Sequence, residues 1–233
     1  MKCVWEHNDD DTLLYSLEYV GAYTRGKSLD EAMAKMNAEI TSYSLWKNQC
    51  YRQEIDIEIV QEKQSNLQIA DADSDVLFDS EKAPLLREEY EELKALVLKS
   101  AMDFYALYSS VSNKHISCLP QRRTFYGNIP RTAQEMYEHT KNVNSYYFGE
   151  IGVNVDNDGT IFDCRKRGFE LLEHTTDFTN NAVIEGSYGE LWSLRKMMRR
   201  FIWHDRIHAK AMYRMAIKTF GEFGAENVFK FTI

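Results

Sequence analysis

The chain has 233 residues, of which 44% are hydrophobic and 27% are charged. Only 11 residues are glycine and 3 are proline, which excludes a collagen-like or linker-like chain and favours long helices over a turn-rich sandwich of strands. The hydrophobic content is too high for a disordered protein. A formal net charge of −8 argues against a generally basic nucleic-acid binder. The sequence contains no run of about 18 apolar residues, so no membrane span is predicted.

The four cysteines lie far apart in the chain and form no C-x-x-C pair; they are Cys3, Cys50, Cys118 and Cys164. This spacing indicates reduced thiols rather than a zinc knuckle or a disulfide framework. The residues after Lys2 are mixed and polar, without the apolar segment and cleavage site of a secretory signal peptide. We therefore expect a soluble, cytoplasmic protein with no membrane partner.

Alternating hydrophobicity predicts two strands in the first part of the chain, at residues 13–20 and 54–60. In the second of these, the isoleucines point one way and the acidic residues point the other. Between the strands, Ser28 and Glu31 form a capping-box pattern, which predicts a helix over residues 29–46.

The chain divides into two parts with different hydrophobic periods. Residues 61–83 are polar and acidic, and we interpret them as a boundary loop with one short strand at 76–78. The expected fold class is α+β, with a small β-β-α-β domain over residues 1–80 followed by a four-helix bundle over residues 85–220. Residues 221–233 are expected to form a C-terminal tail.

The second part has the apolar period of long amphipathic helices. Four helices are predicted, at residues 86–111, 132–150, 161–174 and 188–220. Pro130 comes just before the second of them and suits the first turn of a helix.

The fourth predicted helix carries a pair of histidines, His204 and His208, which lie four residues apart on one helical face. That face is otherwise apolar, so both imidazoles point into the bundle, where an unpartnered imidazole is costly to bury. On the second predicted helix, His139 is also aimed at the core. Three neutral imidazoles from two facing helices can bind a divalent cation and leave a position open for water or substrate, as in catalytic sites.

Other interpretations of the histidines remain open. A core histidine is often hydrogen-bonded and inert. His7, His115 and His174 are expected on the surface or in loops, with His174 as a reserve ligand if the helices pack differently. The H-D-x-x-H run at residues 204–208 is close to the H-E-x-x-H helix of zinc proteases, but its aspartate is shorter than the glutamate that acts there as general base, and no histidine follows to complete the site.

Four further residues are candidates for the surroundings of this site. Asp205 and Glu135 are expected as outer hydrogen-bond partners of the imidazoles, because each lies next to or one turn from a candidate ligand. Tyr146 and Tyr147 are expected to line the pocket and orient substrate; the alternative is that both are ordinary core residues.

The fourth predicted helix also carries a row of basic residues, which we expect to be solvated or paired with acidic residues of the first predicted helix. A nucleic-acid partner is therefore not expected. The row comprises Arg195, Lys196, Arg199, Arg200, Arg206, Lys210 and Arg214, and the acidic candidates are Glu88, Glu89, Glu91 and Glu92.

Three segments resemble a known family. Residues 130–139 (PRTAQEMYEH), 191–196 (LWSLRK) and 203–211 (WHDRIHAKA) are similar to the DinB-like (YfiT-like) metal-binding four-helix bundles. The resemblance covers about residues 85–220. Such proteins place one histidine on the second helix and two on the fourth, which correspond here to the three histidines named above as ligands.

This resemblance implies a bundle that holds Zn²⁺, Ni²⁺ or a similar divalent ion, and it implies a homodimer. Characterised relatives are metal-dependent transferases or isomerases that use low-molecular-weight thiols, and some are proposed hydrolases. We therefore expect a metal-binding protein with a small-molecule substrate, acting as a transferase or hydrolase that activates water or a thiol. The alternative is a non-catalytic binding or sensor protein.

Residues 21–32 (GAYTRGKSLDEA) resemble the HicB-like small α/β domains, in which a glycine-bearing loop leads from a strand into a helix. Such domains occur in antitoxins beside a separate DNA-binding module, and no helix-turn-helix or ribbon-helix-helix segment accompanies this one. The resemblance implies a packing or dimerisation role or, as an alternative function, toxin–antitoxin-like binding of a partner.

Overall fold

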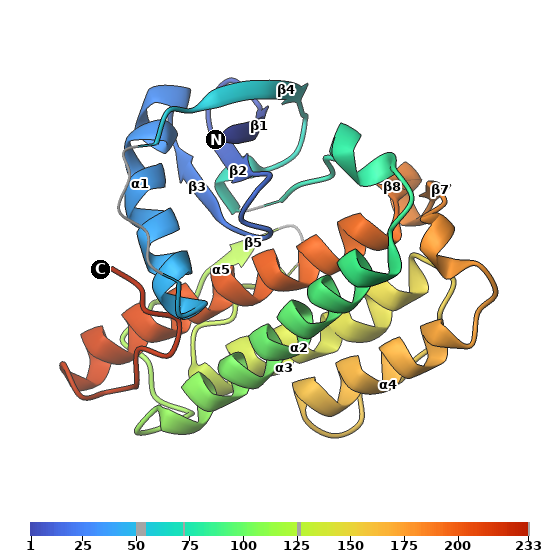
Figure 1. The fold of residues 1–233 in the computed structure, drawn as a ribbon. Coiled ribbons are helices and arrows are strands. Elements are labelled where there is room, and N and C mark those ends of the chain that lie inside the picture. The colour runs from blue at the N-terminus through green and yellow to red at the C-terminus, as the bar shows by residue number, and fades with distance from the viewer. Residues whose placement is uncertain (50–54, 72, 125–126, 233) are drawn as a thin grey trace.

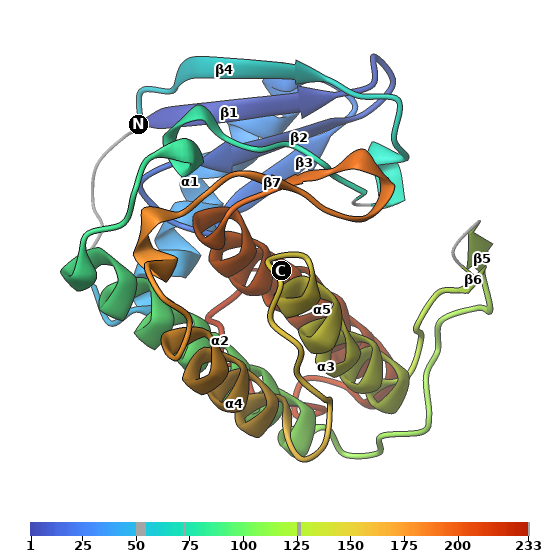
Figure 2. The same cartoon turned by 90° about the vertical axis from the view of Figure 1, so that its right-hand side faces the viewer.

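The computed structural model describes residues 1–49, 55–71, 73–124 and 127–232. Over these residues the protein is α+β, with five α-helices and a small mixed sheet of four strands (Figure 1). The sheet lies on one side of the molecule and four of the helices lie on the other (Figure 2). Within the described ranges, no helix is long and apolar enough to cross a membrane.

The sheet is built from β1 (Lys2–His7), β2 (Thr12–Ser16), β3 (Tyr23–Gly26) and β4 (Glu58–Gln64), in the spatial order β3-β2-β1-β4. Strand β2 is antiparallel to both β1 and β3, whereas β4 runs parallel to β1. Helix α1 (Leu29–Trp46) has the predicted bounds and packs against β2 and β3. Three strands therefore precede this helix, where the β-β-α-β prediction had two and located only one of them, at residues 13–20.

The strand predicted at residues 13–20 ends at Ser16, because the chain turns after it. The amide of Ala22 donates to the carbonyl of Tyr19 at 2.8 Å. Gly21, between them, has a φ of +85°, a conformation that glycine adopts without strain. This turn returns the chain to the sheet as β3; neither β3 nor β1 was located from the sequence.

The other two strand predictions in this part are also corrected. The strand predicted at 54–60 begins later, at Glu58, and Glu54 lies outside the described residues. No strand forms at residues 76–78; the side chains of Val76 and Phe78 instead pack against Val4, Leu13 and Tyr15 of the sheet. The chain then forms a short 3₁₀ turn, η2 (Asp79–Lys82).

Four long helices follow: α2 (Arg87–Ser110), α3 (Ala133–Gly149), α4 (Ile161–Glu173) and α5 (Leu194–Phe220). The first three lie within one residue of their predicted bounds. Helix α5 begins later than predicted, because the chain first forms a short hairpin of β7 (Ile184–Glu185) and β8 (Leu191–Trp192). The hydroxyl of Ser193 then caps α5 by accepting a hydrogen bond from the amide of Lys196 at 3.1 Å.

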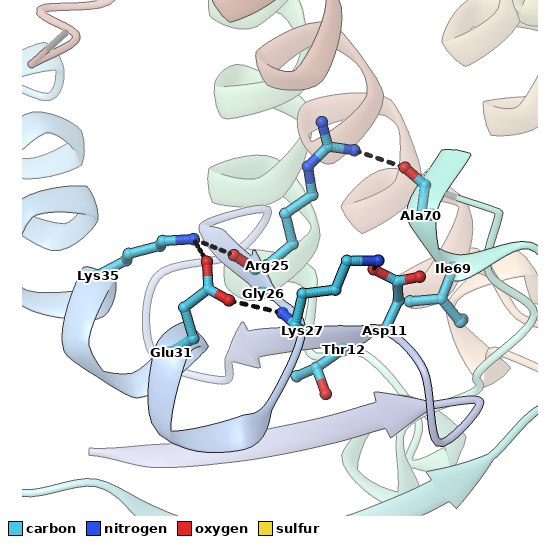
Figure 3. Close-up of a pocket in the computed structure, with 9 residues that line it drawn as sticks. All are labelled: Asp11, Thr12, Arg25, Gly26, Lys27, Glu31, Lys35, Ile69 and Ala70. Atoms are coloured by element: carbon cyan, nitrogen blue, oxygen red, sulfur yellow. Dashed lines mark hydrogen bonds and ion pairs between the residues drawn. The ribbon is translucent and has the colours of Figure 1, made fainter.

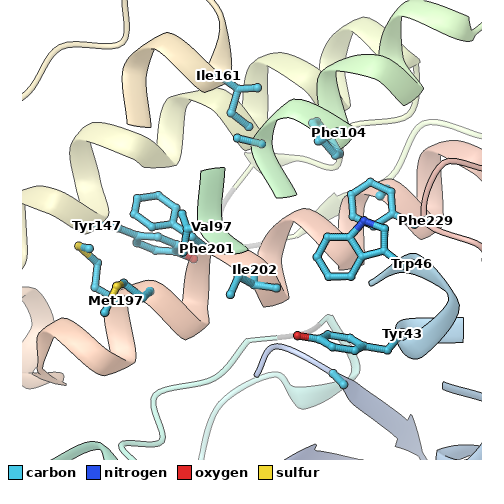
Figure 4. Packing of buried hydrophobic residues seen from close by; sticks show 14 of the residues in the cluster. Tyr43, Trp46, Val97, Phe104, Tyr147, Ile161, Met197, Phe201, Ile202 and Phe229 are labelled. Carbon is cyan, nitrogen blue, oxygen red and sulfur yellow. The ribbon is translucent and has the colours of Figure 1, made fainter. Parts of the chain in front are cut away.

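One hydrophobic core runs through the helices and into the α/β part (Figure 4). Helices α2 and α3 each pack against both α4 and α5. The buried cluster between them continues to α1; it includes Val97, Phe104, Tyr147, Ile161, Met197, Phe201, Ile202, Tyr43 and Trp46. The two parts of the chain therefore share a core.

Most of the basic row on α5 is buried between the helices and the α/β part. Three buried ion pairs have N–O distances of at most 2.8 Å: Lys196 with Glu190, Arg199 with Glu81 and Arg206 with Glu39. Of the acidic residues predicted as partners on the first long helix, Glu89 pairs with Arg195 at 2.8 Å. The row is thus salt-bridged, but mainly by acidic residues outside that helix.

The segment after α5, described as far as residue 232, packs against the rest of the protein and is not a free tail. Phe229 is fully buried and stacks on Trp46, with ring centroids 5.3 Å apart. The amide of Ser112 donates to the carbonyl of Gly224 at 3.1 Å. These contacts hold the segment against α1 and the end of α2.

Candidate metal centre

The structure brings His139 of α3 together with His204 and His208 of α5. The ring centroid of His139 lies 5.2 Å from that of His204 and 4.6 Å from that of His208, and the ring centroids of His204 and His208 lie 4.4 Å apart. One nitrogen from each ring can be chosen so that all three lie within 4.8 Å of one another. The group is therefore close enough to hold a metal ion.

The three rings lie at increasing depth. His139 is exposed, His208 is half-buried and His204 is buried. Desolvation is the main cause that lowers the pKa of each ring: it lowers the pKa of His208 to about 3 and that of His204 well below its usual range, with the neighbouring rings adding to the effect. All three imidazoles are thus neutral near pH 7, the form in which histidine binds a metal.

The donor set fits a divalent transition-metal ion. Nδ1 of His204 is buried and has no hydrogen-bond partner among the described residues, and such a nitrogen is costly to leave unsatisfied. Imidazole suits Zn²⁺, Ni²⁺ and related ions, with metal–nitrogen distances of about 2.0–2.1 Å. Three ligands leave a tetrahedral ion with a position for another group.

Asp205 is not part of this histidine group, although it adjoins His204 in the sequence. Its two carboxylate oxygens each accept a hydrogen bond from the guanidinium of Arg165 at 2.5 Å, and one also accepts from the hydroxyl of Ser100 at 2.7 Å. Both charged side chains are fully buried. The contacts of Asp205 therefore tie α5 to α2 and α4.

Glu135 is also outside the histidine group, because it serves as a helix cap. Its carboxylate accepts hydrogen bonds from the amides of Arg131 at 2.8 Å and Thr132 at 3.3 Å, and its own amide donates to the Thr132 hydroxyl at 3.1 Å. Thr132 is thus the N-cap of α3, and Pro130 lies before this cap rather than in the first turn. The T-x-x-E pattern in the sequence was the signal for this role.

The two tyrosines lie at different distances from the histidines. The ring of Tyr147 is buried and lies edge-on to His204, with ring centroids 6.0 Å apart. Its ring also packs against Trp192, and burial raises the pKa of its hydroxyl. Tyr146 is 37% exposed and meets Trp192 at a centroid distance of 6.1 Å. Tyr147 therefore lines the histidine group, and Tyr146 lies beyond it.

Arg200 is also a neighbour of the site, although the sequence pattern assigned it only to the basic row. Its cation is near enough to His204 to contribute to lowering the pKa of that ring. A signal was present in the sequence: Arg200, His204 and His208 are spaced four residues apart, which places them along one side of α5.

The remaining histidines lie outside the group. His7 was expected on the surface or in a loop, but it is buried in β1 and stacks on Trp5, with ring centroids 4.1 Å apart. His174, the reserve ligand, is exposed at the end of α4, and its Nδ1 lies 2.6 Å from the carbonyl oxygen of Glu170. His115 is exposed, as expected.

A separate open cavity of about 300 Å³ lies in the α/β part (Figure 3). Its charged groups are engaged with one another: Lys27 pairs with Asp11 at 2.8 Å, and Lys35 pairs with Glu31 at 2.5 Å. The guanidinium of Arg25 donates to a backbone carbonyl at 3.0 Å. The lining residues are Asp11, Thr12, Arg25, Gly26, Lys27, Glu31, Lys35, Ile69 and Ala70.

Comparison of the chain with protein-family models, with curated proteins and with solved structures found no match.

Proposed function

We propose that the protein binds a divalent cation, Zn²⁺ or Ni²⁺, through His139, His204 and His208. The observation that carries this proposal is the convergence of three neutral imidazoles from two helices, one of them with a buried, unpartnered nitrogen. The proposal includes the division of the chain into a HicB-like domain (residues 1–80) and a DinB-like four-helix bundle (residues 85–220), which the packing of α2 to α5 supports.

We further propose that the centre is catalytic and that it transfers a low-molecular-weight thiol in preference to hydrolysing a substrate. A bound divalent cation supplies a Lewis acid that favours loss of a proton from water or a thiol. The histidine group contains no carboxylate to accept that proton, because Asp205 and Glu135 are engaged elsewhere. A thiol, with a free pKa of about 8.5, needs less help than water.

The missing carboxylate also favours the second candidate, a non-catalytic binding or sensor protein that uses the same metal site. In either case the HicB-like segment is proposed to have a packing role. Gly21 supports this, because a Cβ atom at its position would lie 2.6 Å from Cγ2 of Ile202. The turn between β2 and β3 therefore lies directly against α5. A homodimer remains a proposal that follows from the family resemblance.

Metal analysis of protein purified without a nickel column tests the site. We expect about one equivalent of zinc or nickel per chain in the wild type and about a tenth or less in His204→Ala, since three ligands are needed. His115→Ala is the matched control, because it removes an exposed histidine outside the group. Equal metal contents in His204→Ala and the control would contradict the proposal.

An assay of turnover distinguishes the catalytic candidate from the non-catalytic binding or sensor protein. We expect metal-loaded protein to transfer small thiols to electrophilic substrates, and we expect a chelator or His204→Ala to abolish the reaction. Hydrolysis of ester and amide substrates by the same preparation is expected to be slower. Full metal content without turnover on either panel would favour the non-catalytic candidate.

A further inference from the structure

Arg200 lies one turn before His204 on α5 and is 92% buried, with 8% of its surface exposed. The other buried lysine and arginine residues in the described part of the chain each have a carboxylate within ion-pair distance; they are Arg165, Lys196, Arg199 and Arg206. Among those residues, no carboxylate lies within ion-pair distance of Arg200; Glu190, which pairs with Lys196, acts on its charge from farther away. Burying a cation without a counter-charge is costly, so the positive charge at this position needs an explanation.

The protein gives the Arg200 guanidinium only neutral contacts. One Nη donates to the backbone carbonyl of Ser74, and Nε has no hydrogen-bond partner among the described residues. The guanidinium carbon lies 5.5 Å from the ring centroid of Tyr147, 5.6 Å from that of Trp192 and 4.8 Å from that of Trp203. Aromatic faces stabilise a cation but supply no counter-charge.

This cation belongs to the surroundings of the histidine group. Tyr147 contacts both, because its ring lies 5.5 Å from the guanidinium carbon and 6.0 Å from the ring of His204. The spacing of four residues places Arg200 and His204 along the same side of α5. An anion held by Arg200 would therefore lie beside the histidines.

We infer that Arg200 binds the carboxylate of a small organic acid that is the substrate of the histidine centre. This inference rests on the proposed function and names its substrate class. A planar guanidinium can hold a carboxylate by two parallel hydrogen bonds, and Nε of Arg200 has no partner among the described residues. Lys196 and Arg200 share one carboxylate, Glu190, which leaves one net positive charge. A monocarboxylate therefore fits better than a phosphate, because it balances that single charge, whereas a phosphate dianion would leave a buried charge.

Thermal unfolding in the presence of a probe anion tests the inference. Sodium propionate is titrated into zinc-loaded wild-type protein against sodium chloride of equal ionic strength, with propionamide as the neutral probe of similar shape and inorganic phosphate as the alternative anion. We expect propionate to raise the midpoint of unfolding with increasing concentration, propionamide to leave it unchanged, and phosphate to raise it less than propionate.

Arg200→Gln is expected to weaken the apparent affinity for propionate by about tenfold to a hundredfold, the range of a charged hydrogen bond. Arg200→Lys keeps the charge and loses the planar fork, so it is expected to restore only part of the affinity. Arg214→Gln is the matched control, because it removes an exposed arginine from the same helix and should respond like the wild type.

The metal content of the same samples distinguishes the two proposals. Wild-type protein that holds metal but gives the same propionate response as Arg200→Gln would overturn this inference and leave the metal site standing. An Arg200-dependent response in protein that binds no metal would contradict the proposed function and keep the anion site. A stronger Arg200-dependent response to phosphate than to propionate would overturn the assignment to carboxylates.

Discussion

At the scale of single residues, the charge state of the histidine group depends on burial more than on charged neighbours. Desolvation is the largest cause of the lowered pKa of all three rings. In the unfolded chain each imidazole is in water, where its pKa is about 6.5. Below that pH the unfolded state takes up protons that the folded state does not, so the stability of the metal-free protein falls as the pH falls.

His208 gives the clearest test, because its pKa drops from 6.5 to about 3 on folding. Its contribution to the free energy of unfolding is fully present above about pH 6.5 and is lost at about 1.4 kcal/mol per pH unit below that pH. Between about pH 7 and pH 5, the metal-free wild type should lose about 2 kcal/mol more than His208→Asn. Urea unfolding in a chelating buffer measures this difference, and His115→Asn should follow the wild type. Parallel curves for wild type and His208→Asn would contradict the desolvation argument.

The histidines and Tyr147 could be predicted from the sequence, whereas the roles of Asp205 and Arg200 could not. A spacing of four residues places His204 and His208 on one face of any helix, and an apolar face identifies the core. The spacing indicates that Arg200 lies near the histidines, but the partners of Asp205 and Arg200 depend on which groups other parts of the chain supply at the same depth. The partner of Asp205 is Arg165, from a different helix, so its role could be assigned only once α4 and α5 were packed together.

At the scale of elements, α5 is anchored by charged pairs inside the core. The pair of Arg165 and Asp205 joins α4 to α5, and Ser100 extends it to α2. Desolvation tends to raise the pKa of Asp205, and Arg165 opposes this by stabilising the carboxylate. Because both side chains are fully buried, removal of either leaves the other as an uncompensated charge.

Arg165→Met should therefore destabilise the protein by about 3–5 kcal/mol, the range observed when one member of a buried pair is removed. Adding Asp205→Asn removes the orphaned charge, so the double variant should be more stable than the sum of the two single effects by about 2 kcal/mol. Urea unfolding of the wild type, both single variants and the double variant gives the coupling energy. Additive effects would show that the pair is not coupled in the folded state.

The strands show why the α/β part was harder to predict than the helices. Strand β1, which was not located from the sequence, is buried on both faces: Cys3 lies in the core cluster that includes α1, and Val4 packs with Val76, Phe78 and Trp203. A strand buried on both faces has no alternation of polar and apolar residues to reveal it. Strand β4 lies at the sheet edge and alternates in exposure, so its region was identified although its start was misplaced.

At the scale of the whole molecule, α5 supports both parts of the fold. One side of it packs against α2 and α3. On the other side, Trp203 meets Tyr15 and Tyr23 of the sheet, with ring centroids 6.0 and 6.1 Å apart. Because a continuous core crosses this helix, we expect the chain to unfold in one cooperative transition, with helical circular dichroism and tryptophan fluorescence changing together.

Gly21 tests whether this contact between the two parts stabilises the fold. An alanine there would adopt a φ of +85° and place its Cβ 2.6 Å from Ile202 and 3.0 Å from the backbone nitrogen of Trp203. Gly152 is the matched control: it has a φ of +80°, and no atom of the described residues lies within 4 Å of its Cβ position. Gly152→Ala should cost about 1–2 kcal/mol for the left-handed backbone alone, and Gly21→Ala should cost about 1–3 kcal/mol more for the overpacking. Denaturant unfolding, followed by circular dichroism and by tryptophan fluorescence, measures the two costs. Equal costs for the two variants would mean that the sheet is not held against α5. Separate transitions of the two signals in the wild type would contradict a shared core.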